Sequence, residues 1–219
     1  MQRRFFTRWH PSAVLLGAQL AAVVVYPFLD EAAGRAALSL LGLVVLVLAV
    51  RAVQATPALT WISILLGVPI ALLTVAEALN PLDERIALWS AVLHAAFYFY
   101  TSYALVRYMF ADPIVTEDEL YATGATFTVL AWGFAYAYMA IQILWPQSFV
   151  STVGSPARTW FELLFLSFTN LTSVGLSDIT PVLPHARSIV MLEQVVGLFY
   201  VGLVISRIVG LTIARQRRS

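Results

Sequence analysis

Between residues 155 and 181 the chain reads Ser155-Pro-Ala-Arg-Thr-Trp-Phe-Glu-Leu-Leu-Phe-Leu-Ser-Phe-Thr-Asn-Leu-Thr-Ser-Val-Gly-Leu-Ser-Asp-Ile-Thr-Pro181. Ser155 is a favourable helix N-cap, Pro156 suits the first helical position, and Glu162 complements the positive end of the helix dipole. A short helix is therefore predicted from Pro156 to about residue 169 or 170. The polar segment that follows contains a glycine and reads as irregular backbone, which is tolerated at membrane depth only when it is buried in protein or lines an aqueous cavity.

Hydrophobic spans surround this stretch on both sides. The chain has 219 residues, of which 60% are hydrophobic and 11% are charged, a composition that excludes an ordinary soluble domain. The sequence contains no cysteine, which excludes disulfides and thiolate metal sites. Apolar runs of about 18 residues or more can cross ~30 Å of hydrocarbon as helices. Such runs cover residues 12–29, 36–53, 57–76, 86–106, 121–145 and 188–214, so the predicted fold is an all-α membrane protein with six transmembrane helices.

The distribution of arginines predicts the orientation. Six spans place both termini on one side of the membrane, and cytoplasmic termini leave only Arg35, Arg85, Arg158 and Arg187 outside. The other nine arginines then lie inside, as the positive-inside rule requires: Arg3, Arg4, Arg8, Arg51, Arg107, Arg207, Arg215, Arg217 and Arg218. We therefore expect a multi-pass protein of the cell (inner) membrane whose loop 146–187 faces outward.

Residues 173–178 resemble the selectivity filter of the potassium-channel superfamily. The usual filter reads Thr-Val-Gly-Tyr-Gly-Asp, and the sequence here reads Ser173-Val174-Gly175-Leu176-Ser177-Asp178. The segment from Glu119 to Phe149 resembles the outer helix of small bacterial two-helix pore domains, and the segment from Ala186 to Gly210 resembles their inner helix. The resemblance implies a pore domain over residues 111–219, with a re-entrant pore helix and filter loop between the fifth and sixth helices.

The same resemblance implies an ion site built from backbone atoms. Four copies of the carbonyl groups of Ser173, Val174, Gly175 and Leu176 would replace the water shell of a permeating K⁺. Thr172, Ser177 and Asp178 complete the predicted filter segment. Because one chain supplies one pore loop, a ring of carbonyls requires a homotetramer in a lipid bilayer. No cofactor is expected apart from the permeant K⁺ or another monovalent cation, and the existence of a regulatory subunit stays open.

Several residues outside the filter are candidates for gating and support. Gly197 is in register with the gating hinge of the resembling family, and Gly202 is a second hinge candidate. Alternatively, both glycines allow close helix packing, as glycine often does in membranes. Glu193 is the only acid in the last span and must be paired, protonated or in contact with water. Its predicted role is to brace the back of the filter through a pore-helix hydroxyl such as that of Thr169.

The first half of the chain matches no family pattern. Residues 1–11 are predicted to form a basic interfacial arm, which fits a membrane surface better than a nucleic acid. Residues 12–110 are predicted to form a four-helix transmembrane region. A voltage sensor needs several arginines spaced three apart, whereas the fourth span offers only His94 within the membrane and Arg107 at its inner end. We therefore interpret this region as a structural sheath, with gating that is at most weakly voltage-dependent. His94 is either a hydrogen-bonded packing residue or a proton sensor.

Two classes of function follow from the sequence. The first is a tetrameric cation channel that conducts potassium, and the alternative is a non-conducting pore-fold protein or transporter-type subunit. An enzyme is not expected, because the sequence shows no acid–base pair, nucleophile triad, phosphate loop or metalloprotease motif. Three departures from the family pattern, Ser173, Leu176 and Ser177, predict relaxed selectivity. Ser177 in particular replaces a glycine where the backbone usually needs positive φ.

Overall fold

A computed structural model describes residues 10–28, 31–54, 60–111, 117–151 and 157–216, with the backbone alone described for 31–41, 117 and 208–216. The predicted basic arm lies outside the described residues except for its last two positions. The elements are α1 (Pro11–Val25), η1 (Tyr26–Phe28), α2 (Glu31–Gln54), α3 (Thr60–Leu79), α4 (Glu84–Met109), α5 (Glu117–Leu144), β1 (Phe149–Ser151), α6 (Trp160–Leu171), β2 (Ile179–Pro181) and α7 (Pro184–Gln216).

A long helix coincides with each of the six predicted spans. Four segments are long and apolar enough to cross a membrane: Pro11–Phe28, Thr60–Leu79, Asp118–Leu144 and Pro184–Arg207. Such helices are typical of a multi-pass membrane protein. In α2 the apolar stretch found among the described residues is shorter, Gly42–Gln54. Helix α4 is not one of the four, and it mixes tyrosine, serine, threonine and histidine with its apolar residues. The six-span count therefore stays a prediction.

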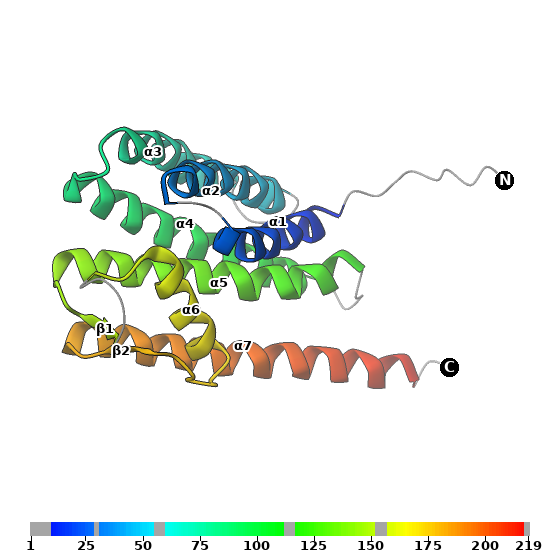
Figure 1. Cartoon of the computed structure of the whole chain (residues 1–219). Helices are drawn as coiled ribbons and strands as arrows, with labels where there is room; N and C mark the ends of the chain where they lie inside the picture. The colour runs from blue at the N-terminus through cyan, green and yellow to red at the C-terminus, as the bar shows by residue number, and fades with distance from the viewer. Residues whose placement is uncertain (1–9, 29–30, 55–59, 112–116, 152–156, 217–219) are drawn as a thin grey trace.

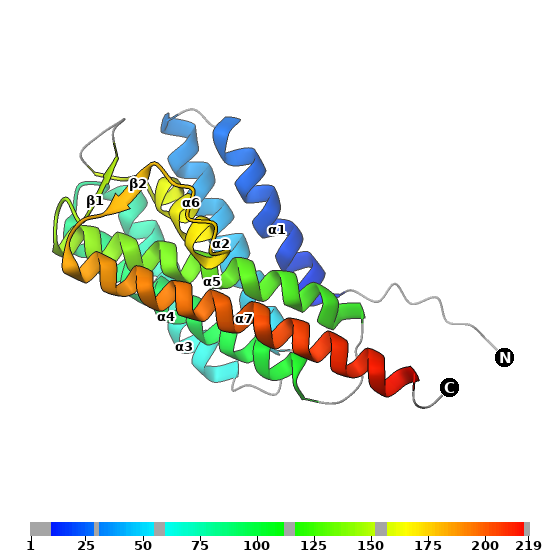
Figure 2. The same ribbon diagram turned by 90° about the horizontal axis from the view of Figure 1, so that it is seen from below.

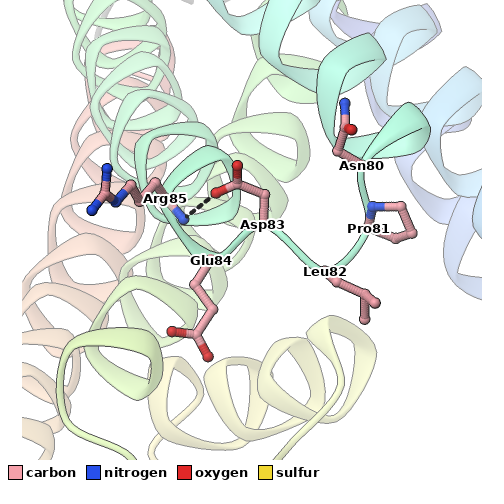
Figure 3. Close-up of a pocket in the computed structure, with 6 residues that line it drawn as sticks. All are labelled: Asn80, Pro81, Leu82, Asp83, Glu84 and Arg85. Carbon is pink, nitrogen blue, oxygen red and sulfur yellow. Dashed lines mark hydrogen bonds between the residues drawn. The ribbon is translucent and has the colours of Figure 1, made fainter.

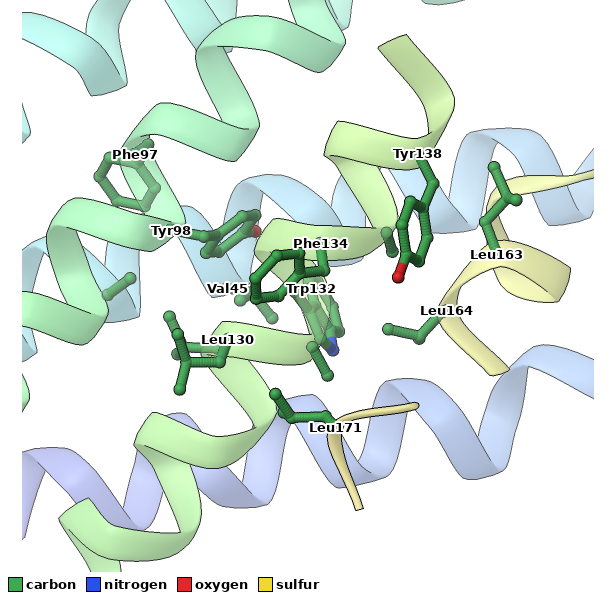
Figure 4. Close-up of a cluster of buried hydrophobic side chains, with 14 of the residues drawn as sticks. Val45, Phe97, Tyr98, Leu130, Trp132, Phe134, Tyr138, Leu163, Leu164 and Leu171 are labelled. Atoms are coloured by element: carbon green, nitrogen blue, oxygen red, sulfur yellow. The ribbon is translucent and has the colours of Figure 1, made fainter. Parts of the chain in front are cut away.

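Helix α5 is the central element. Helices α1–α4 lie on one side of it, and α6 and α7 lie on the other (Figure 1). Helix α4 packs along α5, and Figure 2 shows α7 running beside the same helix. The core around α5 includes large buried side chains, several of which Figure 4 shows: Phe97 and Tyr98 from α4, Trp132, Phe134 and Tyr138 from α5, and Leu163 and Leu164 from α6. Smaller contributions come from other helices, such as Val45 of α2.

Polar contacts join the helices at one end of the bundle. The Ser12 hydroxyl donates a hydrogen bond to the Asp118 carboxylate (2.9 Å), which ties the start of α1 to the start of α5. The adjacent acid, Glu119, pairs with Arg207 of α7 at 3.0 Å. The beginning of α1 and the described end of α7 therefore lie at the same end of the bundle (Figure 1), as an even number of membrane crossings requires.

His94 has the contacts of a packing residue. Its side chain is 4% exposed, and its Nδ1 lies 2.8 Å from the Ser90 carbonyl oxygen one turn earlier in α4. Its ring stacks on Tyr136 of α5, with 4.3 Å between the ring centroids. These contacts satisfy the buried imidazole within the α4–α5 interface and fit the first of the two roles considered for it.

Candidate functional site

The short helix before the predicted filter, α6, begins later than predicted. Thr159 is its N-cap: the Thr159 hydroxyl accepts a hydrogen bond from the Glu162 N–H (3.3 Å), and the Glu162 carboxylate accepts one from the Thr159 N–H (2.6 Å). This capping box satisfies two backbone donors reciprocally. The predicted start at Pro156 is therefore wrong, and Ser155 and Pro156 themselves lie outside the described residues. The helix ends at Leu171, close to the predicted end.

A side chain of α5 fixes the entry to α6. The Gln142 amide donates to the Arg158 carbonyl oxygen (2.9 Å) and accepts from the Arg158 N–H (2.7 Å). The Arg158 guanidinium also contacts Glu162 at 3.3 Å. Because both backbone groups of Arg158 are satisfied by one side chain, the start of α6 is held at a fixed place along α5.

The predicted filter segment folds back on the end of α6. The Thr169 carbonyl oxygen accepts hydrogen bonds from the N–H groups of Val174 (3.0 Å) and Gly175 (2.9 Å). The Ser173 N–H donates to the Asn170 carbonyl oxygen at 2.9 Å. Thr169 therefore supports the segment through its backbone. Its hydroxyl donates to the Leu166 carbonyl oxygen (2.8 Å) and not to Glu193, so the predicted Thr169–Glu193 contact is wrong.

The left-handed positions of the segment differ from those expected. Ser173 has φ 60° and Gly175 has φ 68°, whereas Ser177 is not among the residues with positive φ. The strain predicted at Ser177 is therefore absent. Ser177 instead donates its N–H to the Gly175 carbonyl oxygen (3.1 Å) and accepts the Ile179 N–H on its hydroxyl (3.0 Å). The left-handed conformation costs a side-chain-bearing residue about 1–2 kcal/mol, and that cost falls on Ser173.

The segment is exposed on the single chain and anchored at its outer end. Residues 172–176 are all exposed, and Val174 and Leu176 are 60% and 75% exposed. Asp178 accepts a hydrogen bond from the Ser151 hydroxyl at 2.8 Å, beside the antiparallel pairing of β1 with β2. The filter segment is therefore held at both ends, by α6 and by this short sheet, while its middle is uncovered.

Glu193 joins three helices behind the segment. Its side chain is fully buried and accepts hydrogen bonds from the hydroxyls of Ser167 on α6 and Tyr138 on α5. The Ser167 hydroxyl also lies 2.9 Å from the Ala131 carbonyl oxygen. Asn170 donates to the Tyr138 hydroxyl at 3.4 Å. Glu193 thus contacts a hydroxyl of α6, as expected, but the partner is Ser167, and the sequence analysis missed both Ser167 and Tyr138.

The two glycines proposed as hinges have different surroundings. A Cβ added at Gly197 would lie 2.2 Å from the Leu171 carbonyl oxygen, so α6 and α7 approach each other too closely for any side chain there. A Cβ added at Gly202 would meet nothing within 4 Å. Close packing therefore explains Gly197 in the described conformation, whereas Gly202 is exposed and has no such constraint.

A hollow away from α6 is lined by residues that cap a helix. An open hollow lies on the α3–α4 turn, lined by residues 80–85 (Figure 3). Of its two carboxylates, Asp83 caps α4 by accepting hydrogen bonds from the N–H groups of Arg85 (2.9 Å) and Ile86 (3.3 Å), and Glu84 lies in the first turn of that helix. The described residues contain no group of three or more His, Asp or Glu side chains that could hold a metal ion.

Residues 124–213 match a protein-family model described as an ion channel. The match covers most of α5, all of α6, the filter segment and α7 up to residue 213, so it contains every element of the site. Comparison with curated proteins found no match, and comparison with solved structures found none either. Residues 124–213 are therefore similar to the pore domains of ion channels, and helices α1–α4 precede the matched part. The match is to a channel family and not to an enzyme family.

Removing the Glu193 carboxylate tests its structural role. Glu193→Leu leaves the Ser167 and Tyr138 hydroxyls facing an apolar side chain, which is expected to destabilise the folded protein by about 2–5 kcal/mol. Glu193→Gln keeps an acceptor and should cost less. Gln194→Leu is the matched control, because Gln194 is the next residue of α7 and is exposed. Thermal unfolding in detergent measures the differences, and equal stability of the Glu193 and Gln194 leucine variants would contradict the role.

The contact of Gly197 with Leu171 predicts a second effect. Gly197→Ala should push α7 away from the end of α6 and destabilise the protein by about 1–3 kcal/mol, as overpacking does. Gly202→Ala should be tolerated, because the single chain has open space there. The same unfolding measurement applies, and a tolerated alanine at position 197 would leave the hinge interpretation in place.

Proposed function

We propose that four copies of the chain assemble into a cation channel that conducts potassium, because residues 124–213 match an ion-channel family model. The observation that carries the proposal is the exposed backbone segment at the end of α6, in which the N–H groups of Val174 and Gly175 donate to the Thr169 carbonyl and that of Ser173 donates to the Asn170 carbonyl. With these donors engaged, the segment has carbonyl oxygens left to offer a cation. The resemblance of residues 173–178 to a potassium-channel filter supports the choice of ion.

Several copies are needed because irregular backbone cannot face lipid directly. Exposed apolar residues of α7, such as Leu192, Leu198 and Phe199, are compatible with lipid. Irregular backbone is not, unless protein covers it or water fills the space beside it. Residues 172–176 are uncovered on the single chain. Copies arranged around an axis would cover the segment and leave a hydrated path, and the fourfold number comes from the resemblance.

In this proposal the ion gives up its bound water and is coordinated by backbone carbonyl oxygens instead. The carbonyls of Ser173, Val174, Gly175 and Leu176, repeated in four chains, replace the water shell of K⁺. The Gly175 carbonyl accepts the Ser177 N–H in the single chain, and a carbonyl oxygen keeps a second lone pair. The predicted location is the cell (inner) membrane with cytoplasmic termini, supported by the arginine distribution.

The bond between Ser177 and Gly175 also favours the alternative function. A carbonyl that faces its own chain contributes less to an ion site, and the segment departs from the family pattern at three positions. A non-conducting pore-fold protein is therefore the second candidate. Ion flux separates the two candidates, because they share the same fold and differ only in conduction.

The proposal predicts ion flux that depends on Gly175. Liposomes that contain the purified protein and are loaded with K⁺ should take up a rubidium tracer from outside, driven by the outward K⁺ gradient. The purified protein should be a tetramer by native mass spectrometry. Gly175→Ala should reduce the flux by about tenfold, because φ 68° disfavours a side chain by about 1 kcal/mol or more and Ser173 already bears such a cost in the same segment. Gly17→Ala in α1, where the added Cβ meets nothing within 4 Å, is the control. A folded tetramer without flux would establish the non-conducting alternative.

The departures in the filter predict its selectivity. Leu176→Tyr combined with Ser177→Gly and Ser173→Thr should shift the reversal potential in a K⁺/Na⁺ gradient toward the K⁺ equilibrium potential. Ser173 has φ 60°, where a β-branched residue is strongly disfavoured, so the double variant at 176 and 177 is measured alongside. A native channel that is already strongly K⁺-selective, with no change in either variant, would mean that the departures have no effect on selectivity.

A further inference from the structure

The first turn of α6 is held by an aromatic residue from the other half of the chain. Tyr26, at the end of α1, stacks on Phe161 with 4.0 Å between ring centroids and 10° between ring planes. The Tyr26 hydroxyl faces the side chain of Thr159, the N-cap of α6. These contacts bring the four-helix region directly against the start of the helix that carries the filter segment.

The neighbouring residue of α6 is held from a different side. Trp160 packs edge-on against Trp132 of α5, with 5.0 Å between centroids and 77° between planes. Tyr136 of α5 lies 5.5 Å from the same indole and stacks in turn on His94 of α4. The contact of Tyr26 with Phe161 and the contact of Trp132 with Trp160 together restrict the direction in which α6 can point.

The direction of α6 matters because its far end carries the filter segment. A helix of 12 residues is about 18 Å long, so a tilt of about 5° at its start moves its end by about 1.5 Å. Thr169, near that end, holds the N–H groups of Val174 and Gly175. A small change at Phe161 is therefore transmitted to the carbonyls that are proposed to bind the ion.

We propose that Tyr26 is a positioning residue for ion selectivity, which sets the tilt of α6 through its stack on Phe161. This inference rests on the proposed channel function. An interfacial tyrosine that only anchors α1 in the headgroup region is the simpler role, since such aromatic belts are common. Phe28, two residues later, fits that simpler role because it is 83% exposed. Tyr26 is half-buried and has a parallel ring partner in α6, which anchoring does not require.

Two readouts on one set of full-length variants test the proposal. Tyr26→Ala should raise the Na⁺/K⁺ permeability ratio, measured by reversal potential, by about 3- to 10-fold, the size expected from the loss of one aromatic pair. It should also speed hydrogen exchange of a peptide covering residues 172–178 by a similar factor. Tyr26→Phe should restore both values, because it keeps the ring. Phe28→Ala, which removes an exposed ring, should leave both unchanged.

A second pair of variants provides a test in case Tyr26→Ala does not fold. Tyr26→Leu and Phe161→Leu keep apolar volume, and if the stack is the cause, the double variant should change selectivity no more than either single variant. A Tyr26→Ala protein that matches Phe28→Ala in both readouts would overturn the proposal. Absence of flux in the unmodified protein would contradict the channel function instead. Hydrogen exchange would then decide the positioning role alone: faster exchange in Tyr26→Ala would support it, and unchanged exchange would overturn it.

Discussion

Backbone that is neither helix nor extended sheet must find hydrogen-bond partners within the protein when it lies in a membrane. Residues 173–175 meet this requirement on their donor side, because the C-terminal end of α6 supplies the Thr169 and Asn170 carbonyls. On the outer side, β1 pairs with β2, and the Val182 N–H donates to the Ser148 carbonyl at 2.9 Å. Because the N–H groups of residues 173–175 are engaged, the backbone groups that these three residues still present are carbonyl oxygens, the negative ends of the carbonyl dipoles.

Glu193 and Gly197 act together in placing α7 against this segment. They lie four residues apart, on the same face of the helix. Because Gly197 has no side chain, α7 approaches the Leu171 backbone closely, and one turn away the Glu193 carboxylate reaches Ser167 and Tyr138. Apolar packing alone would allow α7 to slide or rotate. A buried carboxylate with partners on two other helices specifies one register, which is the best-supported use of buried polar groups.

The sequence predicts the long helices well and the site less completely, for physical reasons. Apolar runs bounded by charged or proline-containing turns place the six helices to within a few residues, whereas three-residue strands such as β1 have no periodicity to detect. Two capping signals overlap before α6, Ser155-Pro156 and Thr159-x-x-Glu162, and the reciprocal bonds of the second determine where the helix begins.

The sequence requires a partner for Glu193, but Ser167 and Thr169 both lie on α6. Only the rotation of that helix selects Ser167. Likewise, the motif predicts a filter over residues 173–178 but not which of these residues are left-handed, because that depends on the bonds to Thr169.

The aromatic contacts at the start of α6 also bear on the order in which the chain assembles during synthesis. A ribosome completes α1, α4 and α5 before it reaches residue 160, and N-terminal parts of a chain generally fold first. Tyr26, Trp132 and Tyr136 are therefore available when Trp160 and Phe161 emerge. The early helices can serve as a template on which α6 docks, and α7 arrives last to close over Ser167 and Leu171. Truncation before α6 would thus leave the rings of Tyr26, Trp132 and Tyr136 without their partners on that helix.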